Sequence, residues 1–131
     1  MLEKIARIQD KIGTLVKDTK AYNYKYVDLN QIIEKLTPLL REEGLVLTQP
    51  IKDGNVYTSI ADEAKGEEMT SSLKLPDNLD PQKLGSAITY FRRYTLVSLL
   101  ALTSDDDDGA STVPKKIDKN SSANIDPELG F

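Results

Sequence analysis

The sequence predicts an α+β domain: two N-terminal helices, a three-stranded antiparallel β-meander, a long buried helix, and then a disordered acidic C-terminal tail. Three observations predict this class. Apolar residues recur at helical spacing before residue 44, turn sequences separate short alternating segments between residues 45 and 75, and a largely apolar segment follows Pro81. We expect the domain to span residues 1–104 and the tail to span residues 105–131.

The first two elements are predicted as amphipathic helices over residues 2–17 and 29–43. Asp28 is a suitable N-cap for the second helix, and Gln31 stands where the partner of a capping box is expected. Because Pro38 lies inside the apolar pattern, we expect one bent helix there.

Residues 18–27 join these helices and are expected to be irregular or briefly extended. Tyr22, Tyr24 and Tyr26 alternate with polar residues in this segment. If the segment is extended, the three rings lie on one side of the chain.

Three strands are predicted over residues 45–51, 56–61 and 69–75. The sequence Asp-Gly-Asn at residues 53–55 is typical of a hairpin turn between the first two strands. Loose alternation of polar and apolar residues indicates a sheet with one face in water.

The last predicted helix begins after Asp80, an N-cap, with Pro81 at its first position, and runs to about residue 102. Residues 96–102 are almost entirely apolar. We therefore expect this helix to be buried on most sides, either at the centre of the domain or against another subunit.

The composition excludes several kinds of chemistry. The chain has no cysteine and no histidine, so it lacks disulfides, thiolate metal ligands and the commonest general base. It shows no glycine-rich phosphate loop and no nucleophile–base pair. We expect a protein that is not an enzyme, needs no cofactor, makes no membrane contact and works in the cytoplasm.

The net charge of −4 is unevenly distributed. Residues 105–131 hold seven acidic and three basic residues, whereas residues 1–104 hold 14 of each. A neutral domain can hold a polyanion only if its positive charge is gathered locally or repeated by assembly. We therefore expect a homo-oligomer larger than a dimer.

The segment 85–96 carries two adjacent arginines between two tyrosines on an apolar helix. Arginine donates to phosphate from a planar fork, and tyrosine offers a face on which a base can stack. This pattern indicates a surface for single-stranded nucleic acid; the alternative is a core helix whose arginines reach water. The candidate DNA-binding residues are Arg92, Arg93, Tyr90, Tyr94, Thr89, Lys83, Lys25, Tyr24 and Tyr26.

The two arginines cannot serve the same phosphate, because neighbouring residues on a helix point about 100° apart. We expect one of them to contact DNA. We expect the other to brace the site or a neighbouring subunit, for example through a carboxylate.

A run of four aspartates, Asp105, Asp106, Asp107 and Asp108, follows the last helix. Carboxylates bind hard cations, so these residues are weak metal candidates and leave open a dependence on Mg²⁺. Their spacing does not fit an EF-hand loop. The alternative is a solvated acidic linker.

Several motifs together resemble the essential recombination function (Erf) family of phage single-strand annealing proteins. They are Tyr-Lys-Tyr-Val-Asp-Leu at 24–29, Leu-Thr-Pro-Leu-Leu at 36–40, Gly-Leu at 44–45, the segment Gly-Ser-Ala-Ile-Thr-Tyr-Phe-Arg-Arg-Tyr-Thr-Leu at 85–96, and Asp-Asp-Asp-Gly at 106–109. The resemblance implies ATP-independent annealing of complementary DNA strands by an oligomer, often a ring. It also implies a β-β-β-α core and a bacterial host cytoplasm.

Two other functions remain open at this point. One is a single-strand DNA-binding or recombination-mediator module that does not anneal. The other is a magnesium-dependent nuclease that uses the aspartate run. The tail ends in Asp-Pro-Glu-Leu-Gly-Phe at 126–131, which could recruit host or phage recombination proteins, compete with DNA for the arginines, or have no function.

Overall fold

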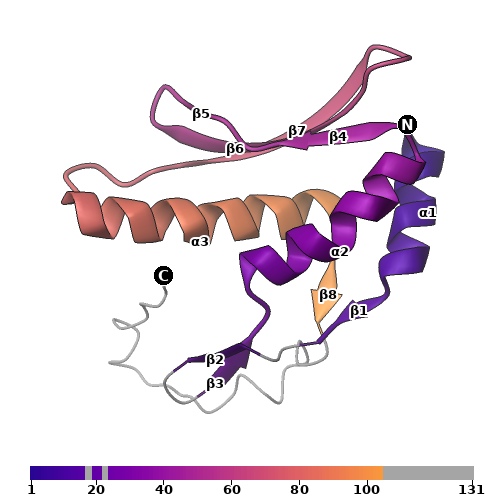
Figure 1. Ribbon diagram of the computed structural model, residues 1–131. Helices are drawn as coiled ribbons and strands as arrows, with labels where there is room; N and C mark the ends of the chain where they lie inside the picture. Colours follow the sequence, from indigo (N-terminus) through magenta and orange to yellow (C-terminus); the bar gives the residue numbers. More distant parts are fainter. Residues whose placement is uncertain (17–18, 22–23, 105–131) are drawn as a thin grey trace.

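The computed structural model describes residues 1–16, 19–21 and 24–104, and it shows a sheet packed on three helices. In Figure 1 the sheet lies along one side of α3, while α2 crosses in front of α3 and α1 packs beside α2. The predicted aspartate site and tail lie outside the described residues. None of the described helices combines the length and the hydropathy of a membrane-spanning segment.

Helix α1 spans Leu2–Ile12 and ends at Gly13, whose φ of 61° favours glycine. The predicted start of this helix is confirmed, but the predicted end at residue 17 was wrong. Residues 14–15 instead form strand β1, Thr14–Leu15, which pairs in parallel with β8, Thr103–Ser104. This pairing holds residues 14–15 in an extended conformation and places them beside residues 103–104, which follow α3.

Strands β2, Thr19–Ala21, and β3, Tyr24–Tyr26, form a short antiparallel hairpin. Helix α2 follows over Leu29–Glu42 and contains Pro38 without being divided into two helices. The predicted capping box is confirmed. The Asp28 carboxylate accepts from the Gln31 backbone N–H at 2.8 Å, and the Gln31 side chain accepts from the Asp28 backbone N–H at 3.0 Å.

The sheet contains β4, Leu45–Thr48, β5, Ile51–Lys52, β6, Asn55–Asp62, and β7, Glu67–Lys74. Strand β6 pairs antiparallel with β7 on one edge and with both β4 and β5 on the other. Thr48 faces Ser59 and Ile51 faces Val56, so β4 and β5 continue in the same register. Strands β4 and β5 together correspond to the first predicted strand, which is interrupted at Gln49–Pro50. With this interruption, the predicted antiparallel order of three strands is confirmed.

Helix α3 spans Pro81–Leu100, with Asp80 as its N-cap and Ala101 in the left-handed conformation at its end. The prediction that it is buried on most sides was wrong for burial within the domain, and burial against another subunit stays a prediction. Its buried residues are Ala87, Thr95, Leu96 and Leu100. Gln82, Gly85, Ser86, Thr89 and Ser98 are exposed. In its N-terminal half only one side of α3 meets the sheet, so the other side is open to solvent among the described residues, whereas the C-terminal half also packs against α1 and α2.

The apolar core is divided into two clusters. The larger one gathers α1, α2, β4 and the C-terminal half of α3, and it includes Ile32, Leu36, Leu96 and Leu100. The smaller one contains Val56, Leu75 and Ala87, with half-buried residues from the N-terminal half of α3 packed against it. The two halves of α3 therefore rest on cores of very different size.

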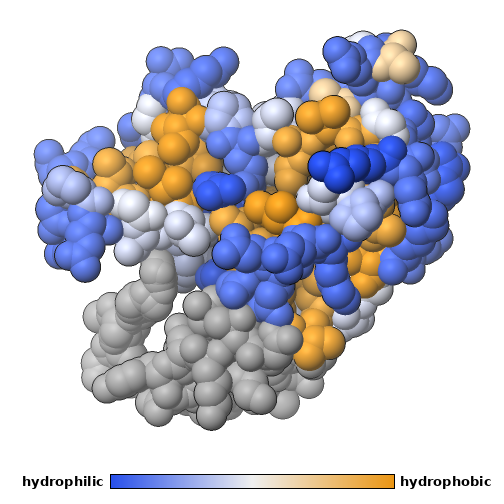
Figure 2. All heavy atoms as spheres, viewed as in Figure 1, coloured by the Kyte–Doolittle hydropathy of each residue, from blue (hydrophilic) through white to orange (hydrophobic). Residues whose placement is uncertain are grey.

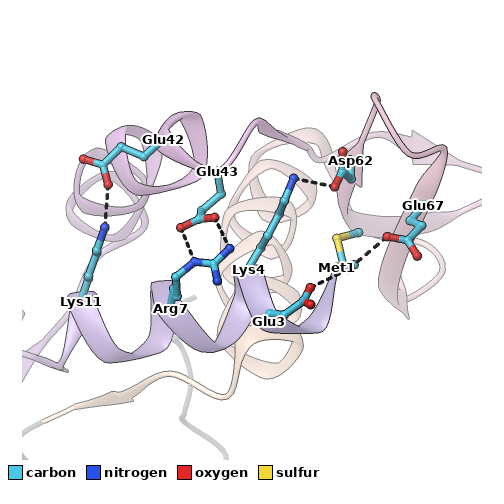
Figure 3. Close-up of polar contacts among 9 residues, drawn as sticks. All are labelled: Met1, Glu3, Lys4, Arg7, Lys11, Glu42, Glu43, Asp62 and Glu67. Carbon is cyan, nitrogen blue, oxygen red and sulfur yellow. Dashed lines mark hydrogen bonds and ion pairs between the residues drawn. The ribbon is translucent and has the colours of Figure 1, made fainter.

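Three basic residues along α1 form ion pairs with carboxylates on other elements (Figure 3). Lys4 pairs with the buried Asp62 at 2.8 Å, Arg7 with Glu43 at 2.8 Å, and Lys11 with Glu42 at 2.9 Å. The Lys4 ammonium holds the pKa of Asp62 below its ordinary value although burial opposes this. The Arg7 guanidinium lowers the pKa of Glu43 in the same way. These contacts fasten α1 to α2 and to the sheet.

Candidate nucleic-acid interface

Helix α3 places the predicted arginine–tyrosine motif in a regular helical arrangement. Thr89 lies four residues before Arg93, and Tyr90 lies four residues before Tyr94. Residues four apart are neighbours on a helix surface. The helix therefore brings these four side chains into one patch next to the exposed side of α3.

Tyr90, Arg93 and Tyr94 form a compact cluster of rings and charge. The Tyr94 hydroxyl donates to the Tyr90 hydroxyl at 2.8 Å, and the two ring centroids lie 4.5 Å apart. The Arg93 guanidinium carbon lies 5.3 Å from the Tyr90 centroid and 5.9 Å from the Tyr94 centroid. Tyr94 is 45% exposed, so the cluster offers an aromatic surface beside a cation.

Arg92 points toward the sheet, away from this cluster. Its Nε donates to the Gln49 side-chain oxygen at 2.8 Å, and the Gln49 amide donates back to the Arg92 carbonyl oxygen at 3.0 Å. The expected division of roles between the arginines fits this geometry, with Arg92 as the bracing residue. Its partner within one copy is an amide, and a carboxylate partner from a neighbouring subunit stays a prediction.

The contact between Arg92 and Gln49 continues into a buried hydroxyl network. The Gln49 amide also donates to Thr58 Oγ1 at 2.9 Å, and Thr58 Oγ1 lies 2.6 Å from Thr95 Oγ1. Thr95 in turn donates to the Phe91 carbonyl oxygen at 2.8 Å, and the Ser71 hydroxyl donates to the Thr95 carbonyl oxygen at 2.7 Å. This polar layer joins α3 to the sheet and satisfies groups that would be costly to bury alone.

The other candidate residues lie farther from the arginines. Lys83 is exposed in the first turn of α3, about 15 Å along the helix axis from Arg93 at 1.5 Å per residue. Lys25, Tyr24 and Tyr26 form strand β3, and their side chains lie outside the described residues. Figure 1 shows the β2–β3 hairpin on the side of α3 that faces away from the sheet.

The weak metal candidates Asp105, Asp106, Asp107 and Asp108 lie outside the described residues. In the part of the chain that the structure describes, no group of three or more acidic side chains is placed to hold a metal ion. The dependence on Mg²⁺ therefore stays a prediction.

Sequence reasoning missed Gln49 and Thr58 as parts of the site. Two signals were present. A Gln-Pro pair interrupts an apolar strand at residues 49–50, and a threonine occupies an inward-facing position of β6 between Val56 and Ile60. Neither signal identifies the contact that is formed, because the partners of Gln49 and Thr58 lie more than 30 positions away on α3.

The fold and the helix surface define a small α+β domain that presents arginine and tyrosine on one side of a long helix. A family model described as the ERF superfamily matches residues 1–128. The chain belongs to the ERF superfamily, which confirms the suspected family. No curated protein and no solved structure matches the chain.

Proposed function

We propose that the chain binds single-stranded DNA and anneals complementary strands without ATP during phage recombination, in the cytoplasm of a bacterial host. Membership of the ERF superfamily supports the recombination role. The observation that carries the proposal is the cluster of Arg93, Tyr90 and Tyr94 on α3. No covalent bond is made or broken in this function.

The cluster suits a single strand in two ways. A guanidinium attracts phosphate, and releasing counterions makes this attraction strongly dependent on salt. An exposed tyrosine ring accepts a base of any identity by stacking. Binding that does not read sequence leaves the Watson–Crick edges free, which annealing requires.

Arg92 is a positioning residue in this proposal. Its contacts with Gln49 fix the turn of α3 that carries both arginines against the sheet. Arg93 then makes the direct phosphate contact from the adjacent position.

Assembly of several copies completes the proposal. The positive and negative charges of residues 1–104 balance, so one copy attracts a polyanion weakly. A homo-oligomer larger than a dimer repeats the same small patch along one strand. Light scattering that shows only a monomer at tens of micromolar, with and without DNA, would contradict this part.

The experiment measures annealing of two complementary labelled oligonucleotides without ATP, together with DNA affinity over a range of salt. We expect Arg93→Ala to weaken binding and to reduce the slope of log affinity against log salt by about 0.7, the value for one phosphate contact on a single strand. Arg92→Ala should weaken binding with a smaller change in slope, since its effect passes through geometry.

Arg7→Ala is the matched control, because it removes one arginine that is already paired with Glu43. It should leave the salt slope unchanged. Normal binding by both the Arg92 and Arg93 variants would contradict the site. Tight binding with no gain in annealing rate would favour a module that does not anneal, and cleavage of the oligonucleotides with magnesium would favour a nuclease.

A further inference from the structure

A groove of about 450 Å³ runs between α2 and the edge of the sheet formed by β4. Ile33, Leu40, Leu45 and Leu47 contribute its apolar walls. Figure 2 shows apolar surface between α2 and the sheet, with hydrophilic side chains on both sides of it. The groove is therefore suited to a partner with apolar side chains.

Two arginines, Arg41 and Arg92, also line this groove. Among the described residues neither arginine forms an ion pair, whereas three cations of α1 are paired with carboxylates. Arg92 uses its Nε for Gln49, and its remaining donors have no hydrogen-bond partner in the described part of the chain. The groove thus combines apolar walls with positive charge that can receive carboxylates.

The edge of β4 beside the groove is a second attachment point. Among the described strands β4 pairs only with β6, so the backbone groups on its other edge have no strand partner. Val46 on this strand is 51% exposed and lines the groove. An extended segment can add to such an edge and place alternate side chains in a neighbouring groove.

The end of the tail has the sequence pattern that this surface requires. Residues 125–131 read Ile-Asp-Pro-Glu-Leu-Gly-Phe, in which every odd position is apolar and Asp126 and Glu128 occupy even positions. An extended chain places these two sets on opposite faces. The whole tail, from residue 105, has a net charge of −4 and is long enough to cross the domain, at about 3.3 Å per extended residue.

We propose that residues 125–131 dock in the groove between α2 and β4, with their apolar face on Ile33, Leu40 and Leu47 and their carboxylates at the rim of the groove, where the long, exposed side chain of Arg41 can turn to meet them. This inference does not rest on the proposed function, because it concerns only the chain's own segments. Docking would also place a negatively charged segment against Arg92, next to the residue proposed to contact DNA.

The absence of cysteine from the chain makes a crosslinking experiment specific. One cysteine replaces Val46 at the groove and another replaces Gly130 in the tail of the full-length chain. We expect this pair to form a disulfide under mild oxidation at least tenfold faster than the control pair Ser72→Cys and Gly130→Cys. Ser72 is exposed on β7, at the opposite edge of the same sheet.

Two further variants separate specific docking from chance collision. Leu129→Ser with Phe131→Ser should slow the groove crosslink to the rate of the control pair. Arg41→Gln should slow it too, while Lys65→Gln, at the exposed turn between β6 and β7, should not. Equal rates for the two cysteine pairs, or no effect of the tail and Arg41 changes, would overturn the proposal. A gel shows whether the crosslink joins one chain or two copies, and either result supports docking of this segment.

Discussion

Helix α1 and the middle of α3 use their polar residues in opposite ways. Lys4, Arg7 and Lys11 on α1 each reach a carboxylate on another element, over buried isoleucines on the same helix. Within the described part of the chain, the turn of α3 that carries Arg92 and Arg93 contacts an amide and two tyrosine rings. The first arrangement holds elements together, whereas the second places a cation beside exposed aromatic surface.

The apolar cores beneath these two regions differ in size. Helix α1 packs into the larger cluster, and the N-terminal half of α3 rests on the smaller one. Between the two clusters lies the layer of Gln49, Thr58 and Thr95. A region with a small apolar contact opens locally at lower free energy than a region with a large one. The candidate binding surface, at residues 89–94 of α3, thus lies where the two cores meet, at the border of the less strongly anchored part.

The largest expected effect is loss of stability in the larger core. Leu36 is fully buried there, so Leu36→Ala should lower the free energy of unfolding by about 2–5 kcal/mol. Leu84, half-buried against the smaller cluster, should lose less than about 2 kcal/mol on the same change. Urea unfolding measures both, and equal losses would show that the two cores contribute equally at these positions.

The polar layer should show strong coupling between its two threonines. Thr95→Val removes one hydroxyl, so the buried Thr58 hydroxyl keeps the Gln49 amide as a donor but loses its contact with Thr95. This loss should lower the free energy of unfolding by about 1–3 kcal/mol. Thr58→Val should have a similar effect. The double variant should lose clearly less than the sum of the two, and additive losses would mean that the pair acts independently.

Acid should weaken the α1 side by a smaller amount, since Arg7 and Lys11 are half exposed and such pairs contribute little. The pKa values of Asp62 and Glu43 are lowered in the folded state. Their contribution to stability is therefore complete above their ordinary pKa of about 4 and is lost as the pH falls below it. Thermal unfolding between pH 6 and pH 3 should show a flatter dependence for Arg7→Met than for the unchanged chain.

The smallest effect is a gain. Gly85 is exposed within α3, has no positive φ, and a Cβ added there meets no described atom within 4 Å. Gly85→Ala should raise the free energy of unfolding by about 0.5–1 kcal/mol, because alanine loses less backbone entropy in a helix. Ser98→Ala, also exposed on α3, is the control and should change stability less. A loss of stability in Gly85→Ala would show that the exposed side of α3 packs against something in solution.

The sequence by itself determined the local features of this protein. Asp28 with Gln31, Asp80 with Pro81, and the turn at residues 53–55 are short-range signals whose chemistry is complete within a few residues. Together with the spacing of apolar residues, these signals predicted the order of helices, strands and final helix. The motif that carries Arg92 and Arg93 is read directly from the sequence. The family could be suspected from the same residues.

Only the tertiary structure decided what depends on contacts far apart in the chain. Helix α1 ends at Ile12, before Gly13 with its positive φ, but residues 14–15 form a strand only because they pair with residues 103–104, and no local pattern encodes that partner. The direction of Arg92 follows from Gln49, 43 positions away. The two cores, the polar layer between them and the open side of α3 arise in the same way, because burial is set by which faces meet and helical spacing alone does not say which face that is.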